Sequence, residues 1–236
     1  MGYRLGTDNR LCLSIASEDA EVVAEMVLWV VKRPESESPR AVADEVAAFA
    51  SQSLSVSVMD REELTDAGCG AILAVAAGSS HEPVILDLTY MPGSAVSQLA
   101  LVGVVFDSGL SIKSAKEMYR MKDDISGAAA VIGATLAMAR LRLPAAVRAL
   151  VPLVENVIGP AAMRPGDVIK TAAGITVEIV STDAEGRLIL ADALTLASRD
   201  APDLIVDVPA SPTPPRRRWD PTSPQSLPSQ GKFLTG

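Results

Sequence analysis

Four acidic residues occupy positions from which their side chains could act together on a metal ion. They are Asp107, Asp124, Asp183 and Glu185. Each stands just after an apolar stretch that predicts a strand or just before one that predicts a helix. Convergent carboxylates without cysteine or imidazole suit hard divalent ions such as Mn²⁺ or Mg²⁺, and Zn²⁺ is also a candidate.

Two basic side chains, Lys113 and Arg187, could assist the metal ions of such a site in catalysis. Two metal ions about 3.5–4 Å apart could deprotonate a bridging water and polarise a carbonyl group. Lys113 and Arg187 are then the fixed positive charges available to stabilise a developing oxyanion. The residue types therefore point to metal-assisted hydrolysis.

The elements that must position these residues alternate between strands and helices. Strands are predicted over residues 55–59, 83–88, 99–106, 147–154, 176–180 and 203–208, with a further candidate at 71–76. Helices are predicted over residues 20–31, 40–51, 61–67, 125–141 and 187–198. This order predicts an α/β fold with a mostly parallel sheet and helices on both faces. Because parallel strands end at one edge, the carboxylates can converge there.

Composition narrows the class of protein. Hydrophobic residues make up 48% and aromatic residues 3%, which predicts an aliphatic core. A net charge of −8 argues against a nucleic-acid partner. Cys12 and Cys69 lack metal or CxxC spacing and indicate free thiols. Val22–Val31 is too short to span a membrane and the start opens no signal peptide, so a cytoplasmic protein is expected.

The composition changes after Val208. Residues 209–236 hold seven of the sixteen prolines and a run of three arginines. This tail has two interpretations, a disordered segment or an out-of-frame translation. The expected organisation is a remnant of an N-terminal region or a linker over residues 1–30, an incomplete catalytic domain over 31–208, and the tail.

The acidic residues also have structural interpretations. Residues 182–185 fit a capping box closed by Thr182 and Glu185 at a helix start, and Asp124 could favour a helix start through its dipole. His81 is the only histidine and is expected at the surface near a strand entrance, which leaves a Ser-His-Asp triad without support. From spacing alone, the metal and capping interpretations both stay open.

Several segments together are similar to one family. Residues 181–188 differ only at Ser181 from Asn-Thr-Asp-Ala-Glu-Gly-Arg-Leu, the signature of the leucyl (cytosol) aminopeptidases. Residues 105–113, 121–130 and 164–168 also resemble that family, in the same order along the chain. Ordered matches are far more specific than any single short motif, so the resemblance favours the metal interpretation.

The resemblance implies a dinuclear metallo-exopeptidase that releases N-terminal residues such as leucine from peptides with a free N-terminus. By position, Asp107, Asp124, Asp183 and Glu185 resemble its metal ligands for two Mn²⁺ or Zn²⁺ ions. Lys113 resembles the lysine that polarises the scissile carbonyl, and Arg187 the arginine that holds a bicarbonate acting as general base. The family assembles as hexamers.

Three departures from the family pattern suggest an alternative function. The lysine ligand expected before Val104 is missing, because no lysine occurs between Lys32 and Lys113. The segment after Asp107 is shorter by one residue, and the tail replaces the family's C-terminal segment. The alternative function is a catalytically impaired relative that acts only as a binding or co-assembly partner.

Overall fold

The computed structural model describes residues 38–48, 54–103 and 125–208, together with the backbone of residues 4–5, 11–12 and 105–107. The strands are β1 (Arg4–Leu5), β2 (Leu11–Cys12), β3 (Leu54–Met59), β4 (Val84–Tyr90), β5 (Gln98–Gly103), β6 (Val105–Asp107), β7 (Ala146–Asn156), β8 (Val168–Lys170), β9 (Thr176–Glu178) and β10 (Leu204–Val208). The helices are α2 (Pro39–Ala48), α3 (Arg61–Asp66), α4 (Gly70–Ala76), α6 (Ser126–Arg140), the 3-10 turn η2 (Thr182–Ala184) and α7 (Glu185–Ser198).

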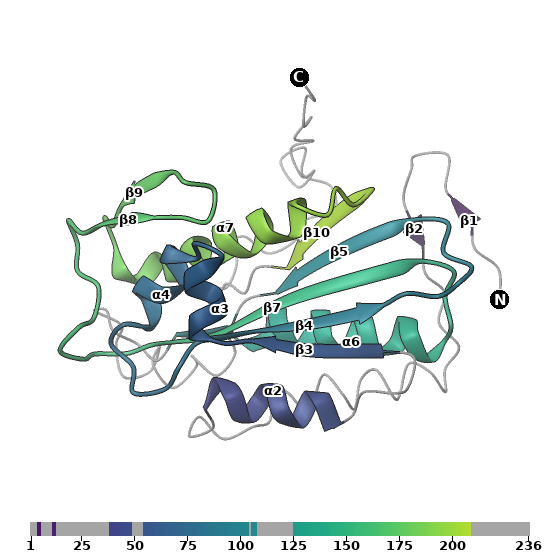
Figure 1. Ribbon diagram of the computed structural model, residues 1–236, viewed down its shortest axis with the longest axis horizontal. Helices are drawn as coiled ribbons and strands as arrows, with labels where there is room; N and C mark the ends of the chain where they lie inside the picture. Colours follow the sequence, from purple (N-terminus) through teal and green to yellow (C-terminus); the bar gives the residue numbers. More distant parts are fainter. Residues whose placement is uncertain are drawn as a thin grey trace, which may run out of the picture.

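One sheet organises the molecule around its longest strand, β7 (Figure 1). The strand order is β10-β5-β7-β4-β3, and β6 also pairs with β7. β10, β5, β7 and β6 run parallel to their neighbours on one side of the sheet, whereas β4 pairs antiparallel with both β7 and β3. Parallel strand ends therefore gather beside the carboxyl end of β7.

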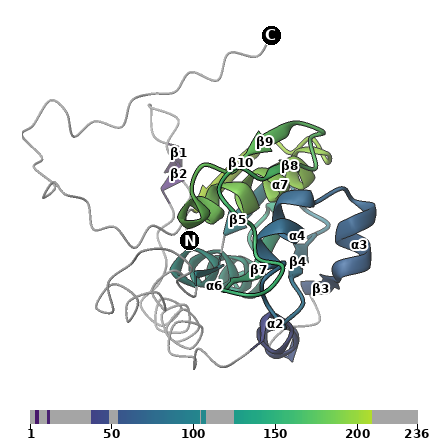
Figure 2. The ribbon, with the colours of Figure 1, turned by 90° about the vertical axis from the view of Figure 1, so that its left-hand side faces the viewer.

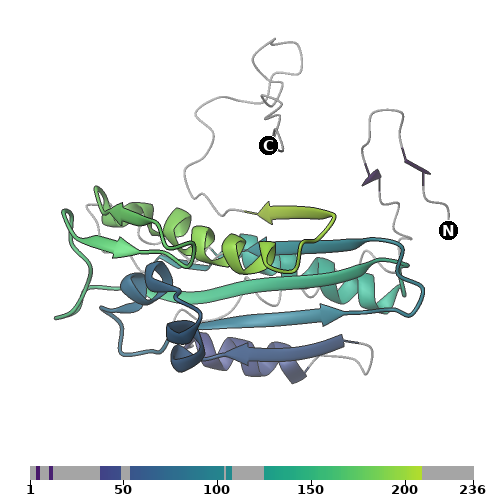
Figure 3. The same ribbon diagram turned by 45° about the horizontal axis from the view of Figure 1, so that its top comes forward.

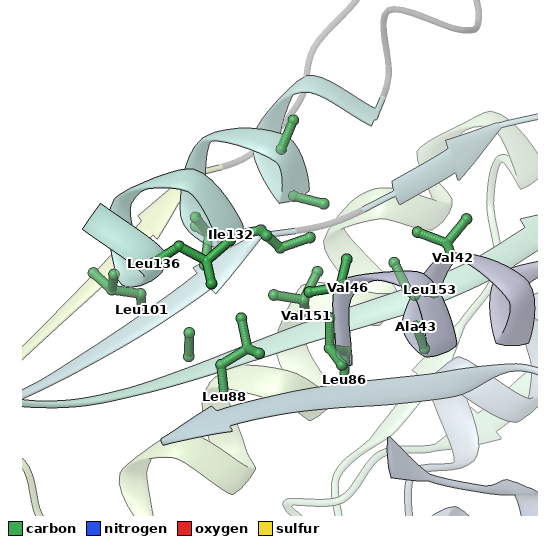
Figure 4. Close-up of a cluster of buried hydrophobic side chains, with 14 of the residues drawn as sticks. Val42, Ala43, Val46, Leu86, Leu88, Leu101, Ile132, Leu136, Val151 and Leu153 are labelled. Atoms are coloured by element: carbon green, nitrogen blue, oxygen red, sulfur yellow. The ribbon is translucent and has the colours of Figure 1, made fainter. Parts of the chain in front are cut away.

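Helices cover both faces of this sheet (Figures 1 and 2). Helices α2 and α6 pack on one face through a cluster that includes Val42, Ile132 and Leu153 (Figure 4). Helices α3, α4 and α7 pack on the other through a cluster that includes Ile72, Leu150 and Ile189. Because strand side chains alternate between faces, adjacent residues of β7 contribute to both clusters. The predicted α/β architecture is confirmed.

Four helices and four strands of the sheet lie close to their predicted bounds. The predicted helices over 40–51, 61–67, 125–141 and 187–198 correspond to α2, α3, α6 and α7, and the strands over 55–59, 83–88, 147–154 and 203–208 to β3, β4, β7 and β10. The strand predicted over 99–106 forms two described strands, β5 and β6. The helix predicted over 20–31 lies outside the described residues.

The strand predicted over 71–76 is wrong, because this segment is helix α4. A short apolar run fits a buried strand and a buried helix equally well. Four of its seven residues are buried, and its first turn receives a carboxylate from α7, described below. Tertiary contacts that are absent from the local pattern thus decide the helical state.

The strand predicted over 176–180 is shorter than expected and does not belong to the main sheet. It is β9, which pairs antiparallel with β8 in a separate hairpin beside α4 and α7 (Figures 1 and 3). Asp183 and Glu185 therefore do not follow a strand of the parallel sheet. Their position depends instead on how α7 packs against β7.

Candidate active site

The last residue of β7 joins the central strand to the start of α7. Asn156 is fully buried. Its Nδ2 group donates hydrogen bonds to the carbonyl oxygen of Thr182 at 3.0 Å and to Oε2 of Glu185 at 3.2 Å. Glu185 is the first residue of α7 and is also buried. The predicted metal ligand Glu185 thus lies at the carboxyl end of the central strand.

The register of β6 brings Asp107 to the same end of the sheet. Val105 lies opposite Leu153, and Asp107 lies opposite Asn156. Over this interval β7 advances one residue further than β6, which is the mark of a β-bulge. Bulges re-aim side chains at sheet edges and beside active sites. The backbone of Asp107 is consequently the sheet neighbour of the residue that holds Glu185.

The turn before α7 and the first turn of α7 carry the other described members of the predicted site. Ser181 is extended, and its Oγ accepts a hydrogen bond of 3.3 Å from the backbone N–H of Asp183. Asp183 and Arg187 are exposed, whereas Glu185 between them is buried. The carboxylate of Glu185 is thus held in the interior, while Asp183 on η2 and Arg187 on α7 are exposed on either side of it.

The capping-box interpretation of residues 182–185 is wrong. Helix α7 begins at Glu185 with Ala184 at its N-cap, and Thr182 lies inside the preceding 3-10 turn. A capping box needs the hydroxyl at the N-cap and the glutamate three residues into the helix. The oxygen Oε2 of Glu185 accepts instead from Asn156. This glutamate is therefore held by tertiary structure.

A second buried carboxylate fixes the middle of α7. Asp192 is fully buried and accepts hydrogen bonds from the backbone N–H groups of Ala71 at 2.9 Å, Ile72 at 3.1 Å and Ala172 at 2.7 Å. Burial raises the pKa of Asp192, and the three N–H donors act in the opposite direction. The carboxylate ties α7 to the start of α4 and to the segment after β8, which restricts rotation of the helix that carries Glu185.

The loop after α4 and the loop after β7 pack against each other next to Asn156. Glu155 accepts a hydrogen bond from Oγ of Ser79 and lies 3.1 Å from Nδ1 of His81. A Cβ added to Gly78 would overlap the carbonyl oxygen of Val157, so the two backbones are in direct contact. Successive residues of β7 thus have separate roles, since Glu155 anchors the loop after α4 and Asn156 holds Glu185. The His81 side chain is 41% exposed, as its predicted surface position requires.

The described side chains include only part of the predicted site. Lys113 and Asp124 lie outside the described residues, and Asp107 is described by its backbone only. Within the described part of the chain, no three histidine, cysteine, aspartate or glutamate side chains form a group that could hold a metal ion. The described carboxylates that could contribute are Asp183 and Glu185.

Asn156 and Asp192 are site-forming residues that the sequence motifs do not identify. Asn156 ends a long apolar run, where an amide must find hydrogen-bond partners once it is buried. Asp192 interrupts the apolar sequence of α7 on its buried side. A polar residue on a predicted core face is therefore the signal that could have identified both, although its partners lie far away in sequence.

Comparison with known proteins places this arrangement in a family. A sequence profile of the cytosol aminopeptidase family, catalytic domain, matches residues 27–211. That match covers more than half of the chain. The chain belongs to the cytosol aminopeptidase family.

Curated relatives carry the same family name. The probable cytosol aminopeptidase of Syntrophotalea carbinolica is 48% identical over 176 residues, which cover 72% of this chain and 35% of that protein. The probable cytosol aminopeptidase of Geobacter sulfurreducens is 41% identical over 215 residues, covering 87% of this chain and 43% of that protein. This family member thus spans less than half the length of these relatives.

Two solved structures of similar proteins share its fold. The cytosol aminopeptidase from Coxiella burnetii matches with a TM-score of 0.74 at 36% identity, over 80% of this chain and 42% of that one. The bottromycin maturation enzyme BotP, solved in complex with Mn, matches with a TM-score of 0.73 at 40% identity, over 80% of this chain and 44% of that one. None of the helices described for this family member is long and apolar enough to cross a membrane.

Proposed function

We propose that this chain is a metal-dependent aminopeptidase that hydrolyses the N-terminal residue, of the leucine type, from peptides. The observation that carries the proposal is the meeting of β6, β7 and α7, where Asn156 hydrogen-bonds Glu185 and is the sheet neighbour of Asp107. Family membership supports the same reaction class. A cytoplasmic hexamer is the assembly that the resemblance favours.

The proposed ligands are Asp107, Asp124, Asp183 and Glu185. An all-carboxylate set fits a hard divalent ion such as Mn²⁺ and can also hold Zn²⁺. The buried, hydrogen-bonded Glu185 fits a ligand whose orientation is fixed in advance. When bound, two such ions supply an activated water and polarise the scissile carbonyl.

The remaining steps belong to side chains of this chain. Lys113 stabilises the negative charge that develops on the carbonyl oxygen. Arg187 is exposed on the first turn of α7, two residues beyond Glu185, and this position suits a residue that holds bicarbonate as the general base. As the resemblance implies, an ion held by these carboxylates would bind the free α-amine of the peptide, which would limit cleavage to N-terminal residues.

Hydrolysis of leucinamide in the presence of Mn²⁺ tests this function. We expect release of leucine that requires the metal and is abolished in Glu185→Ala. Glu178→Ala is the matched control, because Glu178 is exposed on β9 and should leave the rate unchanged. Equal rates in both variants would contradict the proposal.

A second candidate function is an impaired relative that only binds or co-assembles with an intact family member. The observation that favours it is the missing lysine before Val104, since Lys32 is the nearest lysine upstream. In that case the folded chain releases no leucine and forms mixed oligomers with an intact family member, which native mass spectrometry would detect. Leucine release by the purified chain would exclude this candidate.

A further inference from the structure

We propose that Asn156 is a positioning residue that orients Glu185 toward the metal site, an inference that rests on the proposed function. Its single amide group donates to two acceptors, the carbonyl oxygen of Thr182 and Oε2 of Glu185, at 3.0 and 3.2 Å. An amide carries two N–H donors, so one side chain can make both bonds at once. Through these two bonds, Nδ2 of Asn156 on β7 holds both the turn before α7 and the side chain of Glu185.

The chemistry of an amide suits this position better than a charged donor would. A lysine or arginine here would neutralise Glu185 and compete with a cation for its charge. The neutral donor of Asn156 leaves the carboxylate charge in place and still restricts its rotation. Hydrogen bonds of this kind to a ligating carboxylate commonly change metal affinity by roughly 10–100-fold.

The sheet gives Asn156 a second connection to the site. Asp107 lies directly opposite Asn156 in the β6–β7 register, after the bulge in β7. Asn156 is therefore bonded to one proposed ligand and is the backbone neighbour of another. Because Asn156 is fully buried, a small displacement of this residue would also displace β6, β7 and α7. Its role is thus to fix the spacing between Asp107 and Glu185.

Mn²⁺ affinity, measured by electron paramagnetic resonance titration, tests this role without depending on turnover. We expect Asn156→Ala to weaken Mn²⁺ binding by roughly 10–100-fold. Tyr90→Phe is the matched control, because it removes a buried hydrogen bond from Tyr90 Oη to Leu143 at the far end of the sheet. Unchanged affinity in a folded Asn156→Ala variant would overturn the inference while leaving the proposed function intact.

A second measurement needs no substitution, so it does not depend on whether a variant folds. The chain contains two asparagines, Asn9 and Asn156, so asparagine-selective ¹⁵N labelling gives two side-chain amide signals in NMR spectra. We expect saturation with diamagnetic Zn²⁺ to shift the Asn156 signal. Saturation that shifts neither signal would overturn the inference. A chain that binds neither Mn²⁺ nor Zn²⁺ would overturn the proposed function and this inference together.

Discussion

Asp192 accepts a hydrogen bond of 2.7 Å from the backbone N–H of Ala172, and its other oxygen accepts from the first turn of α4. One buried carboxylate thus satisfies donors from two segments that lie far from it in sequence. Helix ends leave N–H groups that need acceptors, and here α7 supplies one to α4. The orientation of α7, and with it that of Glu185, depends on this contact.

Replacing Asp192 by asparagine should therefore destabilise the fold. The amide can accept from one side only, and its NH₂ group would face a backbone N–H on the other. We expect a loss of about 1–3 kcal/mol in the free energy of unfolding measured with urea. Asp44→Asn is the control, because its ion pair with Arg40 is exposed within one helix and is worth about 0.5 kcal/mol. Equal losses in both variants would contradict this account of Asp192.

An ion-pair cluster on the same face of the sheet gives a second prediction. Arg148 on β7 contacts Asp87 on β4 at 2.6 Å and also pairs with Asp200 after α7. The Asp87 side chain is only 11% exposed, so Arg148→Met leaves a poorly solvated charge without its main partner. We expect a loss of about 2–3 kcal/mol in urea unfolding.

The double variant Asp87→Leu with Arg148→Met separates the ion pair from packing. Removing both charges also removes the penalty of an unpaired carboxylate, so the double variant should be more stable than Arg148→Met alone. Losses that simply add would show that the two side chains do not interact energetically.

Cys69 gives a prediction about pH. Burial, followed by the charge of Asp192, raises the pKa of the thiol from 9.0 to about 11. Between these values the unfolded chain loses the proton and the folded chain keeps it, so stability is full below pH 9 and falls as the pH rises toward 11. The decline should be at most about 3 kcal/mol, and smaller in Cys69→Ala.

Alkylation provides a check on the same thiol. Iodoacetamide at about pH 8, followed by peptide mapping, should modify Cys69 only after the chain is unfolded, because the thiolate is the reactive form. Modification of Cys69 in the native chain, at the rate of a small free thiol, would be incompatible with its burial.

The loops behind Asn156 are in such close contact that adding one methyl group at Gly159 should strongly destabilise the fold. A Cβ on Gly159 would overlap the backbone of Gly78, which belongs to the loop anchored by Glu155. We expect Gly159→Ala to cost about 2 kcal/mol or more in urea unfolding, as overpacking does. Gly93→Ala, where an added Cβ meets nothing within 4 Å, should be close to neutral. A neutral Gly159→Ala would mean that the loops can separate freely.

The sequence predicts elements whose signal is local and misses those that distant contacts decide. The strands that became β3, β4 and β7 and the helix that became α6 combine apolar runs with clear breaks, and these were found. Helix α4 was predicted as a strand, because its state depends on Asp192, more than one hundred residues later. The strand predicted over 176–180 was expected in the main sheet but pairs with β8 instead, since strand pairing cannot be derived from periodicity.

The candidate site likewise combines residues that a local motif identifies with a residue that only distant contacts identify. Glu185 and Asp183 were selected by motif, and their place at the end of β7 follows from packing that no short motif contains. Asn156 was missed because its two acceptors, Thr182 and Glu185, lie 26 and 29 residues away in the chain. The missing lysine before Val104 has a structural counterpart. β5 and β6 keep one common register along β7 through Val105, so the missing lysine leaves the pairing of these strands with β7 continuous.

The central claim is that this end of the sheet binds divalent metal and that hydrolysis depends on it. A single titration tests it most directly, with Mn²⁺ occupancy and leucinamide hydrolysis followed in parallel on the same metal-free sample. The account predicts that leucine release rises in proportion to occupancy, and that Glu185→Ala lowers both. Hydrolysis that persists in the presence of a chelator, or Mn²⁺ binding unaffected by Glu185→Ala, would contradict it.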